Sequence, residues 1–82
     1  MKVKVLFFAA CRDVVNRREI EVDVPEGSTA EKVLQHLCET YPRLSELRGR
    51  MALAVNQEYA GGRTVLNPGD TLALIPPLSG GG

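Results

Sequence analysis

The sequence predicts a single α+β domain in which a mixed β-sheet packs on one main helix. Three observations lead to this prediction. Segments with the two-residue periodicity of β-strands lie near both ends of the chain. One segment with helical periodicity and an apolar stripe lies between them. The chain has 82 residues, which suffices for one hydrophobic core and leaves little room for an enclosed active site.

The N-terminal part predicts two strands that pair with each other. The first spans residues 2–9, where Val3, Val5 and Phe7 occupy alternate positions. The second spans residues 19–24, where acidic and apolar residues alternate strictly. We expect a loop around residues 12–18 to join the two strands into a hairpin.

A helix is expected to follow the Pro25-Glu26-Gly27 break and to end near Tyr41. Ser28 and Glu31 have the spacing of a capping box, and Pro42 prevents simple continuation. The apolar residues of this segment recur every three or four positions: Ala30, Val33, Leu34, Leu37, Cys38 and Tyr41. One face of the helix therefore covers one face of the sheet.

The C-terminal half predicts two or three further strands. An irregular stretch with Leu44 and Leu47 leads to a strand at residues 51–55, which contains no polar residue and is expected to be buried on both sides. A turn at residues 56–58 precedes a brief edge strand that begins at Tyr59.

Turn signals also bound the last strand. Gly61-Gly62 predicts one turn, and Asn67-Pro68-Gly69-Asp70 predicts another immediately before a strand at Thr71–Ile75. Pro76 and Pro77 end this strand because proline has no N–H for the ladder. The order of elements is that of a β-grasp (ubiquitin-like) roll with about four to five strands.

The chain should divide into a domain over residues 1–76 and a flexible extended tail over residues 77–82. Gly80, Gly81 and Gly82 lack a Cβ, so they can enter a narrow partner channel, and the Gly82 carboxylate is open to activation or ligation. Frayed termini and linkers have similar compositions, so the glycines alone do not decide between these interpretations.

The outer face of the sheet is unexpectedly apolar. Strand alternation directs one set of side chains toward the helix: Val3, Val5, Phe7, Leu53, Val55, Leu72 and Leu74. It leaves a second apolar set on the opposite face: Leu6, Phe8, Ala52, Ala54, Ala73 and Ile75. Such a patch usually marks a protein interface, although a second small core layer under the loops is an alternative.

Other functions have little support in the sequence. Ten basic and ten acidic residues cancel, which argues against a nucleic-acid partner or an anionic membrane surface, and the absence of a long apolar run argues against a membrane span. Because the N-terminus also alternates like a strand and lacks a signal-peptide core, we expect a cytosolic location. Cys11 and Cys38 are in no C-x-x-C pair and are expected to be free thiols. His36 has no spaced partners, so we expect no metal site. Gly61-Gly62-Arg63-Thr64 lacks the lysine of a phosphate loop and predicts a plain turn.

Three strings resemble a known family, the small, sulfur-carrying subunit of molybdopterin synthase. They are Val5-Leu6-Phe7-Phe8-Ala9 with Arg12, then Ala54-Val55-Asn56-Gln57-Glu58-Tyr59, and residues 68–81 with their Ile75-Pro76-Pro77-Leu78-Ser79-Gly80-Gly81 ending. Thiamine-pathway sulfur carriers and ubiquitin-like modifiers share the fold and the terminal glycines but typically lack the proline pair. The Pro-Pro-x-Ser-Gly-Gly context is therefore the specific part of the resemblance.

The resemblance implies a carrier cycle. A ubiquitin-activating-like adenylyltransferase would use ATP to adenylate the terminal carboxylate, and sulfur would then replace AMP to give a thiocarboxylate. The large catalytic subunit would hold the substrate pocket and convert cyclic pyranopterin monophosphate to molybdopterin, in a heterotetramer of two small and two large chains. The small chain would then have no tightly bound cofactor and no active site of its own.

The same resemblance assigns roles to residues of this chain. The reactive carbonyl is assigned to Gly82, with Gly81 and Gly80 beside it. Phe8 and Ile75 match interface positions of the family, and the remaining interface residues come from the outer face and the tail: Leu6, Ala73, Pro76, Pro77, Leu78 and Ser79.

The chain departs from the family pattern at its last residue. The family usually ends at the second glycine after the serine, whereas a third follows here, and one residue moves the reactive group by up to about 3.5 Å. Three other functions stay open: a protein modifier joined through an isopeptide bond, a sulfur carrier for thiamine or tRNA thiolation, and an interaction module that uses only the outer patch.

Overall fold

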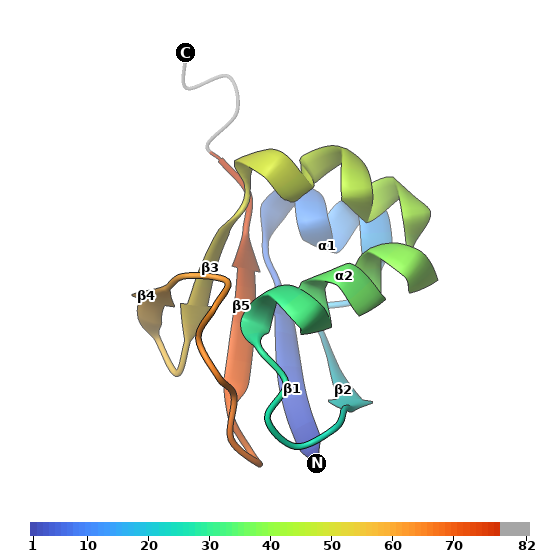
Figure 1. Ribbon diagram of the computed structural model, residues 1–82. Coiled ribbons are helices and arrows are strands. Elements are labelled where there is room, and N and C mark those ends of the chain that lie inside the picture. The colour runs from blue at the N-terminus through green and yellow to red at the C-terminus, as the bar shows by residue number, and fades with distance from the viewer. Residues whose placement is uncertain (78–82) are drawn as a thin grey trace.

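The computed structural model describes residues 1–77. They form one five-stranded mixed sheet with the strand order β2-β1-β5-β3-β4 (Figure 1). The strands are β1 (Lys2–Phe7), β2 (Glu19–Asp23), β3 (Ala52–Val55), β4 (Glu58–Ala60) and β5 (Thr71–Ile75). β1 and β5 run parallel, and the other neighbours run antiparallel. The β-grasp arrangement expected from the sequence is confirmed.

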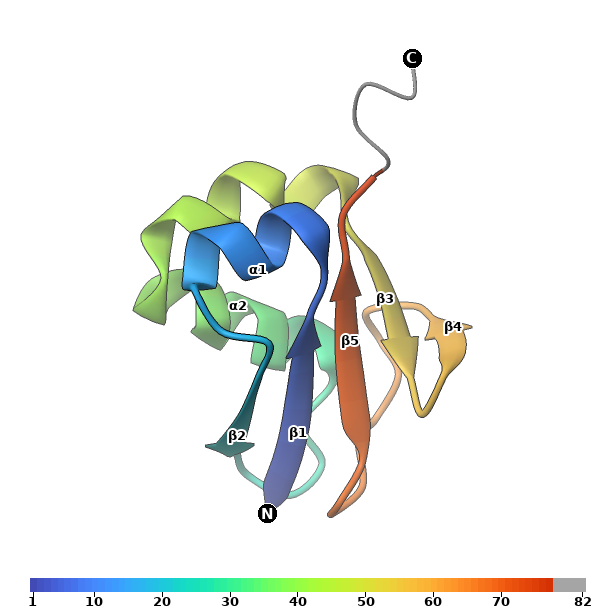
Figure 2. The same cartoon turned by 180° about the vertical axis from the view of Figure 1, so that it is seen from behind.

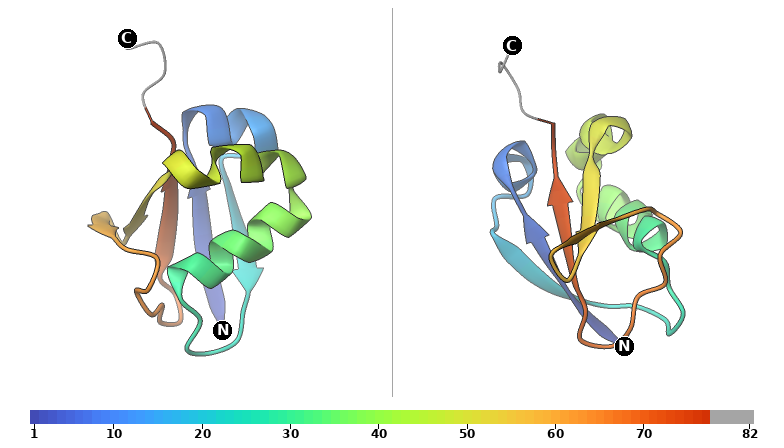
Figure 3. Two further views of the ribbon diagram at one scale, coloured as in Figure 1. Left: turned by 45° about the horizontal axis from the view of Figure 1, so that its top comes forward. Right: turned by 90° about the vertical axis from the view of Figure 1, so that its left-hand side faces the viewer.

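Three helical segments accompany the sheet: α1 (Ala9–Val15), α2 (Ala30–Thr40) and the 3-10 helix η1 (Pro42–Arg50). Figures 1 and 3 show α2 crossing one face of the sheet, which we call the inner face. The views in Figures 1 and 2 agree that α1 and η1 lie at the end of the sheet where β5 finishes. That end is where the chain leaves the domain after Pro76.

The inner face forms the core as the alternation predicted. Val3, Val5, Phe7, Leu72 and Leu74 are at most 1% exposed. The predicted stripe of α2 covers them, because all its apolar residues are buried except the partly exposed Tyr41. The Phe7 and Tyr41 rings meet edge to face, with 6.4 Å between their centroids.

The predicted loop at residues 12–18 is wrong, although the pairing of the two strands that it joins is right. The connection is largely the helix α1, which ends at a left-handed Asn16 whose N–H donates to Arg12 O over 2.7 Å. Cys11 and Val15, one turn apart, are buried. This packing explains why such a short segment is helical.

Two further expectations around α2 need correction. The N-cap is Thr29, whose Oγ1 accepts from Lys32 N over 3.2 Å, whereas the predicted cap Ser28 donates its hydroxyl proton to Pro25 O over 2.6 Å. The stretch described as irregular is η1, which is anchored by the fully buried Leu44. The prediction of one main helix therefore missed the helical segments α1 and η1.

The third strand is not buried on both sides. Ala52 is exposed, Leu53 and Val55 are partly exposed, and only Ala54 is buried. β3 lies next to the short edge strand β4, so little structure covers its flanks. The absence of polar residues from this segment therefore led to a prediction of more burial than the strand has.

β5 ends at Ile75, directly before the proline pair, and the division into a domain over residues 1–76 and a tail over residues 77–82 stays a prediction. Pro76 is buried and Pro77 is exposed. Leu78, Ser79 and the three glycines, which the sequence assigned to the tail, lie outside the described residues.

Candidate docking groove

Strand register brings one row of side chains together across the outer face. Leu6 on β1 lies opposite Ala73 on β5, Ala73 lies opposite Ala54 on β3, and Ala54 lies opposite Tyr59 on β4. On the other side of Leu6, Glu19 of β2 completes the row. Two alanines between larger side chains make a low floor with raised walls.

This row forms the floor and walls of an open groove of about 660 Å³, which we call the outer groove. Its lining residues are Lys4, Leu6, Phe8, Glu19, Ala54, Asn56, Gln57, Tyr59, Thr71, Ala73 and Ile75. Four residues that the sequence assigned to a partner interface, namely Leu6, Phe8, Ala73 and Ile75, are among them.

The prediction of a uniformly exposed patch is wrong in one respect. Ala54 and Ala73 are 6% and 9% exposed because the larger neighbours of each alanine shield it. Ala52, which was also assigned to the patch, is exposed but does not line the groove. The surface available to a partner therefore consists mainly of the groove walls.

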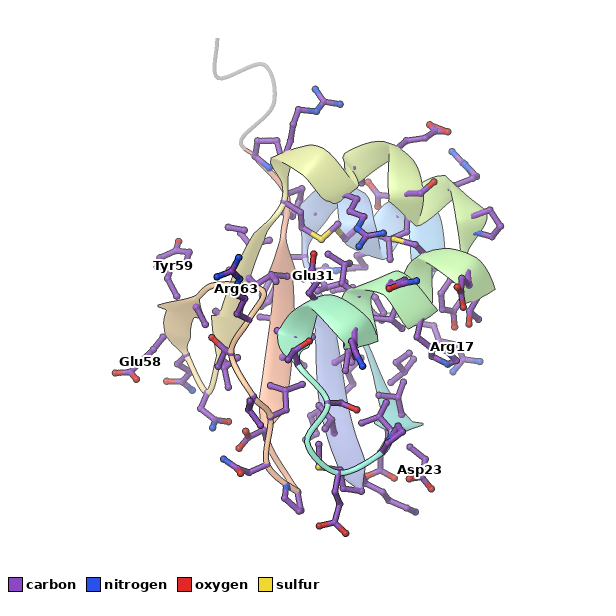
Figure 4. All side chains as sticks on the ribbon, viewed as in Figure 1. Arg17, Asp23, Glu31, Glu58, Tyr59 and Arg63 are labelled. Carbon is purple, nitrogen blue, oxygen red and sulfur yellow. The ribbon has the colours of Figure 1, made fainter. Side chains whose placement is uncertain are left out.

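Tyr59 is the largest wall residue that the sequence did not assign to the interface. It is 79% exposed, and Figure 4 shows its side chain extending away from the sheet at the edge strand. Asn56 and Gln57, both with positive φ, form a two-residue hairpin turn that sets Tyr59 opposite Ala54. The turn predicted from the sequence instead spans residues 56–58, and a turn of three residues does not predict that Tyr59 lies opposite Ala54.

One end of the groove is polar and held by hydrogen bonds. The Asp70 carboxylate accepts from Asn56 Nδ2 over 3.0 Å and from Asn67 N over 2.8 Å, and Asn56 Oδ1 accepts from Thr71 N over 3.0 Å. The hydrogen bond from Asn56, followed by that from Asn67, lowers the pKa of Asp70. Nearby, Lys4 Nζ lies 3.7 Å from Glu19 Oε2.

The opposite end of the groove is apolar and adjoins the tail exit. Phe8, 40% exposed, lies there with Ile75, the last residue of β5. Ile75 is followed at once by the two prolines. A partner that fills the groove would therefore stand next to the chain that leaves the domain.

The other candidate groups do not join this site. Cys11 and Cys38 are buried free thiols, and burial raises the pKa of Cys11 to about 11, so its nucleophilic thiolate is suppressed. His36 is exposed on α2. Among residues 1–77, no cluster of three or more histidine, cysteine or acidic side chains could hold a metal ion.

A search of the same residues for a helix that is both long enough and apolar enough to cross a bilayer finds none.

The fold defines the class of this protein as a ubiquitin-like β-grasp domain, and the outer groove lies beside the end of β5. The whole-chain fold is similar to that of SAMP1 from Haloferax volcanii, with a TM-score of 0.87, 30% identity, and 98% and 99% of the two chains covered. It is also similar to a chain in the complex of subunits 1 and 2 of the molybdopterin-converting factor from Helicobacter pylori, with a TM-score of 0.71, 23% identity, and 98% and 99% coverage.

Sequence comparison specifies the family. Residues 5–81 match the model of the ThiS family. The molybdopterin synthase sulfur carrier subunit of Arabidopsis thaliana is 38% identical over 81 residues, which cover 99% of this chain and 84% of that protein. The chain belongs to the ThiS family and, within it, to the molybdopterin synthase sulfur carrier subunits, as the proline-glycine ending indicated.

Proposed function

We propose that this chain is the sulfur-donating subunit of a molybdopterin synthase and that it acts in the biosynthesis of molybdenum cofactor. The observation that carries the proposal is the similarity over nearly the whole chain to molybdopterin synthase sulfur carrier subunits. The outer groove supports it, because a carrier needs a recognition surface beside the segment that it presents.

The chemistry would take place at the C-terminal glycine. A carboxylate is a poor electrophile, so a separate activating enzyme would use ATP to form the acyl adenylate and release pyrophosphate. A sulfur nucleophile would then attack the acyl carbon, and AMP would leave with the electron pair of the broken C–O bond. The product is a thiocarboxylate, a soft nucleophile at neutral pH. In this scheme ATP is a substrate of the activating enzyme and is not held by this chain.

The groove would supply the recognition in this cycle. Its apolar end at Phe8 and Ile75 would dock the large subunit, so that the tail enters the catalytic pocket of that partner. The Helicobacter pylori structure, a complex of subunits 1 and 2, offers a precedent for such an assembly. We propose the same pairing here, in a heterotetramer of two small and two large chains located in the cytosol.

A second function has a specific observation in its favour. The similar Haloferax volcanii protein SAMP1 is a small archaeal modifier protein, and its fold agrees with this chain over 98% of the length. In a modifier, the terminal carbonyl would be joined to a lysine amine through an isopeptide bond. The two functions share the adenylate and diverge at the nucleophile that displaces AMP.

Intact mass after incubation with the activating enzyme, ATP and a sulfur source tests the carrier function. A shift that corresponds to replacement of one oxygen by sulfur, localised to the last glycine, is expected. Deletion of Gly82 and Gly81→Ala would show which glycine the reaction requires. Gly61→Ala is the matched control, because Gly61 has negative φ and open space where its Cβ would stand.

The outcomes separate the two functions. A sulfur-loaded chain that converts cyclic pyranopterin monophosphate to molybdopterin with the large subunit supports the carrier. Slower-migrating conjugates that survive reduction, formed without a mass shift in the free chain, support the modifier. An unchanged mass and no conjugates, with an active enzyme control, would contradict both.

A further inference from the structure

One residue of the described chain has an unusual backbone conformation. Among residues 1–77, four non-glycine residues have positive φ: Ala9, Asn16, Asn56 and Gln57. Asn16 caps a helix, and Asn56 and Gln57 form the hairpin turn, so three have a local explanation. Ala9, with φ of 47°, is instead the first residue of α1, where residues normally have negative φ.

The burial of Ala9 does not explain its conformation. Its side chain is exposed, whereas the residues two positions before and after it, Phe7 and Cys11, are 1% and 0% exposed. An L-residue in the left-handed region is strained, and such strain persists only where the surrounding structure enforces it. The reason for the positive φ of Ala9 must therefore lie in the structure of the neighbouring residues.

The neighbour that it affects most directly is Phe8. Phe8 remains extended, with φ of −117° and ψ of 148°, and its N–H donates to Leu74 O over 3.3 Å, which continues the ladder between β1 and β5. Its carbonyl accepts from Cys11 N over 3.0 Å, inside the first turn of α1. The direction of the chain thus changes within one residue, at Ala9.

We infer that Ala9 is a positioning residue whose left-handed backbone holds the Phe8 ring at the apolar end of the outer groove. Strand alternation directs Phe8 to the outer face only if the chain stays extended through residue 8. The helix must nevertheless start at once for Cys11 to join the hydrophobic core. A left-handed residue at position 9 meets both requirements. The role belongs to the backbone conformation and not to the methyl group, because a residue with a Cβ adopts positive φ less readily than glycine does.

The inference uses the proposed docking role of Phe8, but its first test needs no partner. Cys11 permits native chemical ligation of a synthetic segment 1–10 to residues 11–82, so D-alanine can be placed at position 9. D-alanine favours positive φ and keeps a Cβ. It should raise Tm by about 4–8 °C by removing the strain of the L-residue. The nuclear Overhauser contacts between the Phe8 ring and Ile75 should match those of the all-L chain.

Variants at positions 9 and 10 separate positioning from stability. Ala9→Gly should leave Tm within about 4 °C of wild type, since relief of strain offsets the added freedom of the unfolded chain. Glycine adopts positive φ readily, so this variant should also keep the contacts of the Phe8 ring. Ala9→Val, whose β-branched side chain disfavours positive φ, should weaken these contacts and reduce affinity for the large subunit about two- to fivefold. Ala10→Gly, the matched control inside α1, should lower Tm and leave the Phe8 contacts unchanged.

Weaker ring contacts in Ala9→Val, with wild-type ring contacts in Ala9→Gly and Ala10→Gly, support the inference. Wild-type ring contacts in Ala9→Val, or a lower Tm with D-alanine, would overturn it. If the all-L chain itself fails to bind the large subunit, the proposed function is refuted. The ring contacts and Tm still decide the role of Ala9 in that case.

Discussion

Replacement of Tyr59 by alanine should weaken docking strongly and affect folding little. A tyrosine has roughly 200 Å² of accessible surface. Because Tyr59 is 79% exposed, about 160 Å² remains for a partner to cover. At about 25 cal/mol per Å², complete burial is worth at most about 4 kcal/mol. The covered remainder, about 40 Å², contributes only about 1 kcal/mol to folding.

Isothermal titration with the large molybdopterin synthase subunit measures the first quantity, and thermal unfolding measures the second. We expect Tyr59→Ala to lose about 2–4 kcal/mol of binding free energy, a roughly 30- to 1,000-fold weaker Kd. Tyr59→Phe should retain most of the affinity, because the ring supplies nearly all of the area.

The control is Val65→Ala. Val65 is the other strongly exposed large apolar residue besides the groove residues Phe8 and Tyr59, at 55%, within the part of the chain that the structure describes. It bridges to Thr29 at the start of α2 and does not line the groove. An affinity of Tyr59→Ala within about twofold of wild type, or an equal loss in Val65→Ala, would refute the assignment of the groove as the docking surface.

Two further predictions concern titratable groups. The pKa of Asp70 is lowered in the folded state, so its hydrogen bonds stabilise the fold above the carboxyl pKa of the unfolded chain, and this contribution is lost as pH falls through the folded pKa. Urea unfolding at pH 7 and pH 3 should therefore show a smaller acid-induced loss of stability in Asp70→Asn than in wild type; equal losses would contradict this. The pKa of Cys11 is raised to about 11, so its contribution is complete below the thiol pKa of the unfolded chain and is lost as pH rises through about 11. Thiol labelling near pH 8 should be slow in the native chain and fast in urea, and rapid native labelling of Cys11 would show that this part of the core opens.

The elements that the sequence predicted well are those fixed by local chemistry. β5 has the predicted bounds because a turn signal precedes Thr71 and the proline pair follows Ile75. The stripe of α2 is right because an 11-residue helix repeats its pattern often enough to be recognised. The inner face of the central strands follows from alternation alone.

The elements that were missed depend on tertiary structure. α1 has only seven residues, too few for a helical period to stand out, and it exists because Cys11 and Val15 bury against the core. Its left-handed Ala9 is contrary to the intrinsic preference of alanine, so no propensity argument would place a helix start there. The burial of Ala54 depends on β5 and β4 beside it, which the sequence of β3 does not specify.

Only part of the groove was predicted, because the position of its other residues also depends on tertiary structure. Alternation gave Leu6, Ala73 and Ile75, because each lies on a strand whose inner face was recognisable, and it gave Phe8, which directly follows β1 and is still extended. Prediction of Tyr59 and of the polar end required the register of β4 on β3. A change of one residue in the length of the turn shifts this register. The two-residue turn at Asn56 and Gln57 was the available signal, since a short turn fixes which residues face each other.

In the proposed carrier cycle, recognition and chemistry belong to different parts of the chain. The outer groove is fixed at one end by the Asp70 and Asn56 hydrogen bonds and at the other by the backbone of Phe8 and Ala9. Neither end contains a group activated for catalysis, and the thiols are buried elsewhere. A carrier that serves both an activating enzyme and a synthase needs this separation. In that cycle each partner would recognise the same groove, while the terminal carbonyl would change from carboxylate to adenylate to thiocarboxylate. Substitutions in the groove should therefore alter Kd, and substitutions of the terminal glycines should alter sulfur transfer within an assembled complex.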